Sequence, residues 1–460
     1  MRLLTLFAAV AMLAACGVPE TTPETDRRAA EIDLPPMKTF SRPQVTLPSR
    51  SNVDLTRDFL ELSFALESGR RLPVFTRFEG PVTVRVTGRE APSLRGDLDR
   101  LIGRLRREAG IDISRVPRDQ AASITIEVVS RAELRRTVPQ AACFVVPRIS
   151  SWSKFRRFRS SPRLDWTTLA VRETMAIFLP GDVAPQEVRD CLHEELAQAL
   201  GPLNDLYRLS DSVFNDDNFH TVLTGFDMLM LAATYAPELR SGMSPEAVAA
   251  RLPAILDRLN PQGRGGGAGP ASPTPREWIN AIETALGPRT SPRARQAAAE
   301  RAVAIATRAR WTDTRLAFSL YALGRLSLGS EPELALASFL QAGTLYRSQP
   351  GTRLQAAHVA MQLSAYALSA GQARAAIEIV DDNLRTVADA ENAALLATLL
   401  MVKAEGLALL GRSEEADAVR LDSLGWARYG FGSDAEVRDR AREISGLVPR
   451  REEPSQGTTQ

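Results

Sequence analysis

The chain of 460 residues is long enough for two or three domains. Its 57 lysines and arginines nearly balance its 55 aspartates and glutamates, so no overall positive field indicates nucleic-acid binding. After the first 15 residues, no stretch is long and apolar enough for a membrane-spanning helix. We therefore expect neither a nucleic-acid partner nor a transmembrane helix.

Residues 1–15 have the layout of a secretory signal peptide. Arg2 supplies a positive charge, residues 3–13 carry no charge, and two alanines then precede Cys16. The 13 residues from Leu3 to Ala15 are too few to cross a bilayer, which needs ~20. This pattern predicts an exported protein.

The four residues Leu13-Ala14-Ala15-Cys16 resemble the lipobox of bacterial lipoproteins. The resemblance implies that Cys16 is acylated and becomes the new N-terminus, so that the protein is held to a membrane. An ordinary secretory signal with a chance cysteine is the alternative. Gly17 is not the aspartate associated with inner-membrane retention, which favours the periplasmic face of the outer membrane. Residues 16–52, rich in Pro, Thr, Ser and charge, are predicted to be a flexible tether.

Two cysteines remain once Cys16 is set aside. An exported protein enters a compartment that oxidises thiols, so Cys143 and Cys191 are predicted to form a disulfide. Two buried free thiols are the alternative.

Residues 53–258 carry mixed strand and helix signals, which predict an α+β domain with helices packed on a sheet. The last helix has clear boundaries, because Asp182 could cap it, Pro185 suits its first turn and Gly201 ends it. The predicted strands cover residues 72–86, 124–129, 142–146 and 169–179, and the predicted helices cover residues 97–109 and 185–201.

Residues 259–276 contain RGGGAGPASPTP, which is typical of a flexible linker, and residues 277–448 are predicted to be almost entirely helical. Gly329, Gly371 and Gly411 recur at intervals of 42 and 40 residues, each before an alanine-rich helix. The helix with Ala335, Phe339 and Ala342 resembles a tetratricopeptide repeat, although the intervals exceed that family's 34 residues. A plain helical bundle is the alternative. Residues 449–460 are predicted to be a disordered tail.

The segment His193 to Asp205 reads HEELAQALGPLND and resembles the zinc-binding signature of metzincin peptidases, HExxHxxGxxHD. When this segment is aligned with that signature, other residues stand at the positions of the three zinc-binding histidines. The general base, the glycine turn and the final acid are retained. The replaced positions are Glu194, Gln198 and Asn204, and the retained ones are Glu195, Gly201 and Asp205.

Zinc needs ligands that this segment no longer offers. Two histidines at i and i+4 reach one ion from one helix face, but Glu194 and Gln198 supply a single carboxylate and an amide. His193 cannot substitute, because its i+4 partner is Ala197. We therefore expect no bound metal, no cofactor and no peptidase activity, since Glu195 has no metal-activated water. An active metal-dependent hydrolase with non-histidine ligands is the alternative.

Two later stretches extend the resemblance. Residues 212–214 (Ser-Val-Phe) are similar to the Ser-x-Met turn of matrixins, and Leu223-Thr224-x2-Asp227 is similar to the start of their closing helix. Together with the lipobox, the chain resembles a proteobacterial lipoprotein family catalogued only as a domain of unknown function (number 2927). That resemblance implies a lipoprotein with a degenerate zincin-like domain and supplies no activity.

These patterns favour a non-catalytic binding or assembly role. Residues 277–448 are expected to bind an envelope protein, while the degenerate peptidase-like domain recognises a polypeptide or another envelope component. A basic run, KFRRFRSSPR at residues 154–163, has two interpretations. It is either a solvated loop or a contact for anionic headgroups or polymers.

Overall fold

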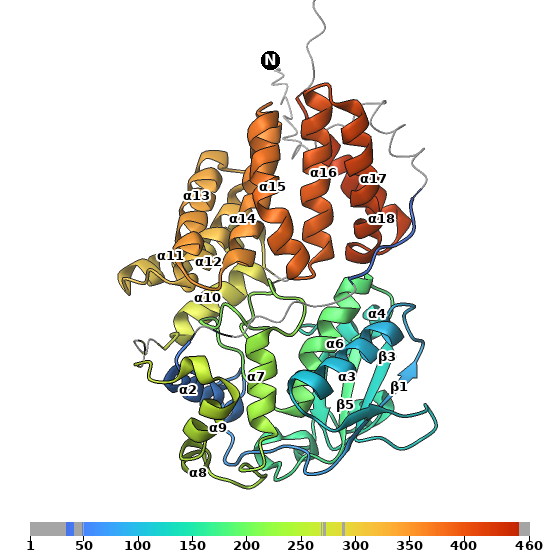
Figure 1. The fold of residues 1–460 in the computed structure, drawn as a ribbon, viewed down its shortest axis with the longest axis vertical. Coiled ribbons are helices and arrows are strands. Elements are labelled where there is room, and N and C mark those ends of the chain that lie inside the picture. Colours follow the sequence, from blue (N-terminus) through green and yellow to red (C-terminus); the bar gives the residue numbers. More distant parts are fainter. Residues whose placement is uncertain are drawn as a thin grey trace, which may run out of the picture.

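The computed structural model describes residues 34–40, 48, 50–267, 269, 273–287 and 290–449. The predicted signal peptide, Cys16 and residues 450–460 of the predicted tail lie outside these residues. The described chain contains a sheet in its N-terminal half and only helices from Arg276 onward (Figure 1). Among the described helices, none combines the length and apolar character needed to cross a membrane.

Five strands form one mixed sheet in the order β2-β1-β3-β5-β4. Neighbouring strands are parallel except for β4, which runs antiparallel to β5 at the edge. All six residues of β5 are buried, as expected for a strand covered on both faces. The strands are β1 (Val82–Gly88), β2 (Ile113–Arg115), β3 (Ile124–Val129), β4 (Phe144–Pro147) and β5 (Met175–Pro180).

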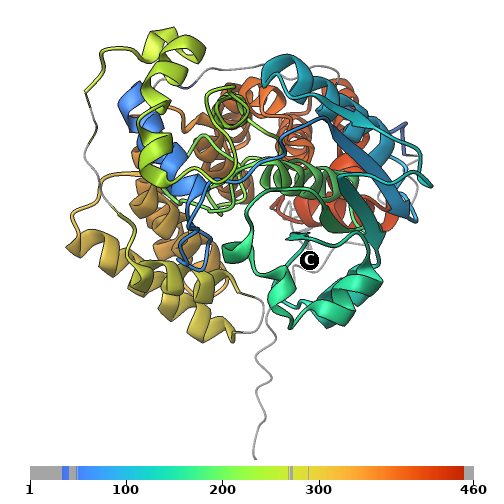
Figure 2. The ribbon, with the colours of Figure 1, turned by 90° about the horizontal axis from the view of Figure 1, so that it is seen from below.

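Helices cover both faces of the sheet (Figure 2). On one face, α3 (Leu94–Glu108) and α6 (Pro185–Leu200) bury their apolar sides against strand residues such as Ile177. On the other face, α5 (Trp152–Phe158) packs around Phe178, whose ring centroid lies 5.0 Å from that of Trp152. The alternation of side chains along β5 therefore places α5 and α6 on opposite faces.

Shorter helices complete this half of the molecule. Their N-termini are capped by side chains at several points, including Ser51 before α2 and Ser130 before α4. They are α2 (Asn52–Ser63), α4 (Arg131–Thr137), α7 (Gly225–Thr234), α8 (Pro245–Ala249), α9 (Leu252–Leu259) and the 3-10 turns η1 (Pro162–Leu164), η2 (Trp166–Thr168) and η3 (Pro261–Gly263).

The C-terminal half is all helical, as predicted. Gly371 and Gly411 lie at inter-helix turns with positive φ angles of 72° and 75°, which glycine adopts without steric cost. A Cβ added to Gly324 would lie 2.7 Å from the ring of Phe339, so the glycine allows close helix packing. The helices are α10 (Arg276–Leu286), α11 (Pro292–Arg308), α12 (Thr314–Ser327), α13 (Pro332–Ser348), α14 (Arg353–Ser369), α15 (Ala373–Asp389), α16 (Ala393–Leu409), α17 (Ser413–Gly430) and α18 (Asp434–Ser445).

The two halves are joined by buried polar contacts around the start of α6. Arg189 of α6 donates to Glu391, in the turn between α15 and α16, at 2.8 Å, and both side chains are almost fully buried. The hydroxyl of Tyr429 on α17 donates to the carboxylate of Asp97 on α3 at 3.0 Å. These contacts attach the helical region to the two helices that support the sheet.

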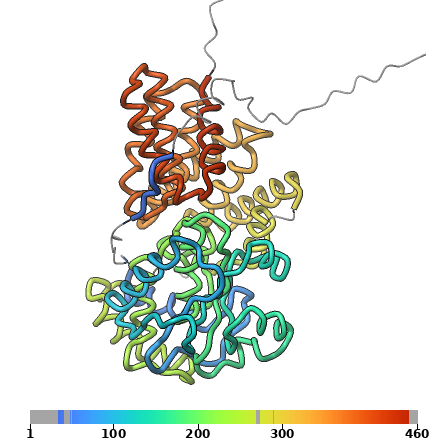
Figure 3. The backbone as a smooth tube through the Cα atoms, turned by 90° about the vertical axis from the view of Figure 1, so that its right-hand side faces the viewer, coloured from blue at the N-terminus to red at the C-terminus, as the bar shows by residue number. Residues whose placement is uncertain are grey.

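Part of the predicted flexible tether packs against α17 (Figure 3). The ring of Phe40 stacks on Trp426 with a centroid distance of 4.5 Å, and the backbone N–H of Lys38 donates to the carbonyl of Gly425 at 2.9 Å. Residues 34–40 of the predicted flexible tether therefore have defined partners on α17. The proline-rich and polar composition of this segment did not indicate that the ring of Phe40 has a partner on α17.

Two local predictions also need correction. The predicted strand at residues 72–86 is a regular strand only from Val82, because Phe75 exchanges backbone hydrogen bonds with residues 242 and 243 instead of with the sheet. Asp182 does not cap α6, since Ala184 is its N-cap and the Asp182 carboxylate accepts from the N–H of Arg131 at 2.7 Å.

Candidate functional site

The C-terminal half of α6 carries three of the residues singled out in the sequence. Glu194 and Gln198 lie one turn apart on the same side of the helix, and Glu195 lies next to them. The guanidinium of Arg172 donates to the carbonyls of Gln198 and Gly201, each at 2.5 Å. A buried cation at a helix C-terminus stabilises its free carbonyls, so this end of α6 is firmly held.

Gly201 ends α6 where α7 approaches it closely. A Cβ added to Gly201 would lie 3.1 Å from the side chain of Thr234, and the hydroxyl of Tyr235 donates to the carbonyl of Leu200 at 3.1 Å. The absence of a side chain at Gly201 thus allows the end of α7 to pack closely against the end of α6.

Asp227 connects the two later stretches that extend the sequence resemblance. The hydroxyl of Ser212 donates to its carboxylate at 2.5 Å, and the N–H of Val213 donates at 3.2 Å. The same carboxylate accepts from the N–H of Thr224 at 2.7 Å and completes the capping box of α7. The turn at residues 212–214 is therefore held against the start of α7, below α6.

Three acidic side chains, Glu67, Glu194 and Asp205, affect one another's ionisation beside α6, and we refer to them as the carboxyl cluster. Burial, and then the negative charge of Asp216, raises the pKa of Glu67. Burial, reinforced by the negative charges of Glu67 and Asp216, raises the pKa of Glu194 to about 8. Burial and then the charge of Glu194 hold the pKa of Asp205 well above its usual range. The pKa of Glu194 thus favours its neutral form at neutral pH, although the Glu67 residue itself is exposed.

Glu195 follows Glu194 on α6, and its side chain reaches the edge of the sheet. Its side chain is only 5% exposed, and the backbone N–H of Val145 in β4 donates to its carboxyl group. Burial and the neighbouring Glu194 hold the pKa of Glu195 well above its usual range. Its Oε2 atom has no hydrogen-bond partner among the described residues. The position that corresponds to the general base thus lies beside β4.

Asn204, which aligns with a zinc ligand of metzincins, and the nearby His193 have structural contacts. The side-chain amide of Asn204 donates to the carbonyl of Glu61 at 3.0 Å, which ties the turn after α6 to α2. His193 accepts from the N–H of Leu223 at 3.1 Å, and burial holds the pKa of its imidazole well below its usual range. Within the described part of the chain, no group of three or more His, Cys, Asp or Glu side chains is arranged to hold a metal ion.

Glu67 is the residue of the site that the sequence did not reveal. It lies in the loop after α2, far from α6 along the chain, and no motif surrounds it. Asp205 was recognised through its place in the metzincin signature, but its pairing with another carboxyl group was not. Such a pairing depends on how the loop after α2 folds back, which local sequence does not record.

The predicted disulfide is confirmed, since the sulfur atoms of Cys143 and Cys191 are 2.03 Å apart. The bridge joins the residue before β4 to α6, one turn before Glu194 and Glu195. It therefore fixes the start of the edge strand above the helix that carries the site.

The outer edge of β4 is free of backbone partners among the described residues. β4 pairs with β5 on one side only, and residues 144–147 make no backbone hydrogen bond outside that ladder. An unpaired strand edge can bind another strand through its backbone groups. On this edge Pro147 has no N–H and the N–H of Val145 is directed to Glu195, so the carbonyl oxygens are the groups available to an added strand. In this protein, the free edge runs directly beside Glu195.

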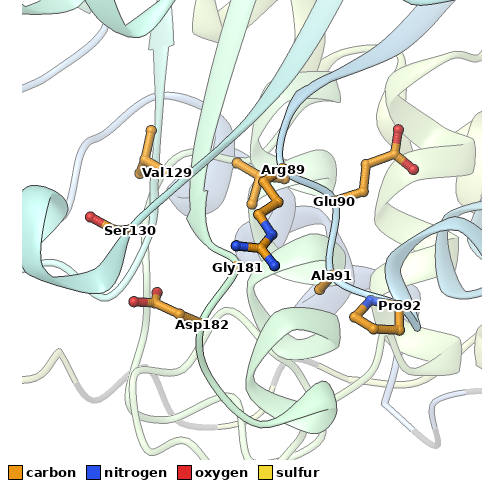
Figure 4. Close-up of a pocket in the computed structure, with 9 residues that line it drawn as sticks. Arg89, Glu90, Ala91, Pro92, Val129, Ser130, Gly181 and Asp182 are labelled. Carbon is orange, nitrogen blue, oxygen red and sulfur yellow. The ribbon is translucent and has the colours of Figure 1, made fainter.

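A cavity of about 540 Å³ lies elsewhere, where β1, β3 and β5 end (Figure 4). Its polar side chains are largely engaged, because Ser130 accepts from the N–H of Glu133 and Asp182 accepts from the N–H of Arg131. Since α6 starts at this end of the sheet and runs back along it, the cavity and the carboxyl cluster lie at opposite ends of α6. We assign the cavity no role in the site.

The raised pKa of Glu194 gives a prediction for stability against pH. Its pKa is about 8 in the folded protein and near 4.5 when unfolded, so the folded state binds more protons between these values. Stability should therefore fall as pH rises from 5 to about 8. We expect Glu194→Gln to raise the free energy of unfolding at about pH 8.5 by about 1–3 kcal/mol, because it removes a half-buried charge.

Urea denaturation at several pH values tests this expectation. The exposed Glu414, replaced by glutamine on α17, is the matched control and should leave the pH dependence unchanged. An identical pH dependence in the Glu194→Gln protein and the native protein would contradict the assignment of a half-buried, protonated Glu194.

Comparison with known proteins gives a family without a known activity. Residues 52–254 match the model of a family described as "Protein of unknown function (DUF2927)". The matched region begins at α2 and includes the sheet, α6, the carboxyl cluster and α7. No curated protein and no solved structure matches the chain.

Proposed function

We propose that residues 52–254 form a catalytically degenerate zincin-like domain that binds an extended polypeptide along β4. In this proposal the protein is a lipoprotein, anchored through Cys16 to the periplasmic face of the outer membrane. Residues 277–448, a tetratricopeptide-like stack of helices, bind a second protein of the envelope. The chain is thus a binding or assembly factor and not an enzyme.

The arrangement of elements supports the zincin-like part of the proposal. A parallel sheet with one antiparallel edge strand lies above α6, Gly201 ends that helix, and Asp227 fixes the turn at residues 212–214 beneath it. These parts occur in the order expected from the resemblance to metzincins. The match of residues 52–254 to one family model supports treating them as a single domain.

The chemistry of the site supports binding over catalysis. Asn204 is engaged with α2, Glu194 is held largely protonated, and an amide such as Gln198 is a poor zinc ligand. Glu195 is bonded to the backbone of β4 instead of facing a metal-bound water. In this proposal, the domain keeps the edge of β4 that receives a polypeptide and has lost the residues that would cleave it.

The free edge of β4 beside Glu195 is the observation on which the proposal rests. Strand addition uses backbone hydrogen bonds, and only alternate residues of the added strand direct their N–H groups toward β4. We expect extended decapeptides, in which threonine alternates with glutamate, serine or lysine, to bind. The probe protein is residues 17–460, secreted without the lipid anchor, and fluorescence anisotropy measures the affinity.

Backbone N-methylation of the tightest-binding peptide tests the proposal. Methyl groups on alternate residues should abolish binding in one frame and leave it nearly unchanged in the other, because only one frame blocks the donors that face β4. Equal effects of the two frames, or no binding by any of the peptides, would contradict strand addition.

Acylation of Cys16 is tested by metabolic labelling with radioactive palmitate. The native protein is expected to incorporate label and to sediment with the outer membrane, whereas Cys16→Ser should incorporate none, because it lacks the thiol. Cys143→Ser is the matched control, since a disulfide-bonded cysteine offers no thiol for acylation. Label retained by the Cys16→Ser protein would exclude this anchor.

A metal-dependent hydrolase is the second candidate, and the carboxyl cluster is the observation that favours it. Glu194 and Asp205 are oxygen donors beside the position of the retained base. One equivalent of zinc bound by residues 17–460, and lost in Glu194→Gln, would favour this candidate over a binding role.

A further inference from the structure

We propose that the polypeptide bound along β4 is acidic and that an arginine-rich surface around this strand selects it. This inference rests on the proposed function, because it names the chemistry of the polypeptide that adds to β4. We define the basic surface as the exposed arginines and lysine of residues 131–163, the segment that includes α4, β4, α5 and the start of η1.

The charge of this segment differs from that of the rest of the chain. Residues 131–163 contain nine basic side chains and one acidic side chain, Glu133, a net charge of +8. The whole chain carries +2, so the remaining residues together carry −6. The positive charge of the protein is thus concentrated in the segment that contains the free strand edge.

Most of these basic side chains are exposed and have no acidic partner. The single acidic residue of the segment, Glu133, has a basic partner, since Arg156 lies 3.8 Å from its carboxylate. Six other exposed basic residues of the segment have no ion pair with any described residue: Arg135, Arg136, Lys154, Arg157, Arg159 and Arg163. Their charges are therefore available to an anionic ligand.

The aromatic residues of α5 are turned inward. Trp152 and Phe155 are buried against Phe144 and Phe178 of the sheet, and the indole N–H of Trp152 donates to Glu133 at 2.6 Å. This packing fixes α4 and α5 and leaves their basic sides facing solvent. Exposed large apolar side chains occur elsewhere among the described residues, at none of the positions 131–163. The basic surface thus lacks apolar groups that could insert into a bilayer, which favours a polypeptide over a membrane.

The register of the sheet places these charges beside an added strand. Phe144 and the helix α5 lie on the same face of the sheet, with ring centroids of Phe144 and Phe155 4.9 Å apart. Successive side chains of a strand point to opposite faces, so every second residue of a strand added to β4 would face the α5 side. Acidic residues at those positions would meet the basic surface.

The loop after β4 is held in the same region. Arg148 has a positive φ of 63°, and its guanidinium donates to the carbonyl of Arg163 at 3.1 Å and to the hydroxyl of Thr168 at 2.8 Å. These bonds keep the end of the basic run close to the end of β4. Basic residues therefore flank the edge strand from α4, from α5 and from this loop.

The three alternating decapeptides test the inference. We expect the Thr-Glu peptide to bind residues 17–460 at least about 10-fold more tightly than the Thr-Ser peptide, and the Thr-Lys peptide to bind most weakly. The affinity of the Thr-Glu peptide should fall as NaCl rises from about 50 mM to about 300 mM, because exposed charges are screened by salt. Arg135→Ser, Arg136→Ser and Arg159→Ser, combined, should reduce the Thr-Glu preference about 10-fold and leave Thr-Ser binding unchanged.

Arg106→Ser with Arg107→Ser is the matched control, because both are exposed arginines on α3, at the other face of the sheet. The control should retain the full preference for Thr-Glu. Equal binding of the three peptides, still sensitive to the N-methylation frame, overturns the acidic specificity and leaves the proposed strand addition intact. Binding to phosphatidylglycerol vesicles without any preference among the peptides also overturns it, since the surface would then recognise lipid.

Discussion

Replacing Arg189 with alanine is expected to lower the free energy of unfolding by about 3–5 kcal/mol. The guanidinium donates to Glu391 at 2.8 Å and lies 5.2 Å from the ring centroid of Tyr429, with almost no contact with solvent. Alanine leaves the Glu391 carboxylate buried without its partner, and removing one member of a buried pair costs more than the pair contributes. Urea denaturation, followed by circular dichroism, measures the loss.

The double variant Arg189→Met with Glu391→Met separates burial of an unpaired charge from loss of packing. It removes both charges and keeps apolar volume, so it should recover most of the lost stability. Arg440→Ala, which breaks the exposed pair with Glu443 on α18, should change stability little. A double variant as unstable as Arg189→Ala would contradict the assigned role of the ion pair.

Removing the disulfide with Cys143→Ala and Cys191→Ala is expected to cost about 4 kcal/mol. The bridge closes a loop between residues 48 positions apart, and a loop of that length loses about this much chain entropy in the unfolded state. The loss should appear as a lower urea midpoint at constant protein concentration.

The same replacement should also weaken peptide binding, because the bridge holds the start of β4 over α6 near Glu195. Reduction of the native protein with dithiothreitol is the control and should reproduce both effects. Unchanged stability after removal of both cysteines would show that other contacts hold β4 in place.

Local signals in the sequence account for what could be predicted of α6 and its surroundings. Pro185 and Gly201 mark the two ends of the helix, and the structure places them at its first residue and its C-cap. The disulfide followed from two cysteines in a chain expected to be exported. The division into a sheet-containing half and a helical half followed from residue composition and periodicity.

Contacts between distant segments account for what could not be predicted. Glu67 joins the carboxyl cluster only because the loop after α2 folds back onto α6. Phe40 stacks on Trp426, which is far from it along the sequence. Aspartate is a common helix-capping residue, yet the carboxylate of Asp182 accepts from the N–H of Arg131 at the end of the sheet. In each case the local pattern was compatible with several partners, and tertiary packing selected one.

The position of Glu195 connects the fold to the proposed role. If the domain is zincin-like, as we propose, Glu195 occupies the position of the general base, and the N–H of Val145 in β4 donates to its carboxyl group. The histidines that would supply a metal-activated water are replaced by Glu194, Gln198 and Asn204. In the proposed role, the edge of β4 receives a polypeptide, and the usual zinc ligands are replaced.

Native mass spectrometry of residues 17–460 mixed with the Thr-Glu decapeptide tests the central claim, binding without cleavage, most directly. The account predicts a complex whose mass equals that of the protein plus one intact peptide, with no added mass from zinc. A protein that carries one zinc ion and is accompanied by peptide fragments would contradict the account.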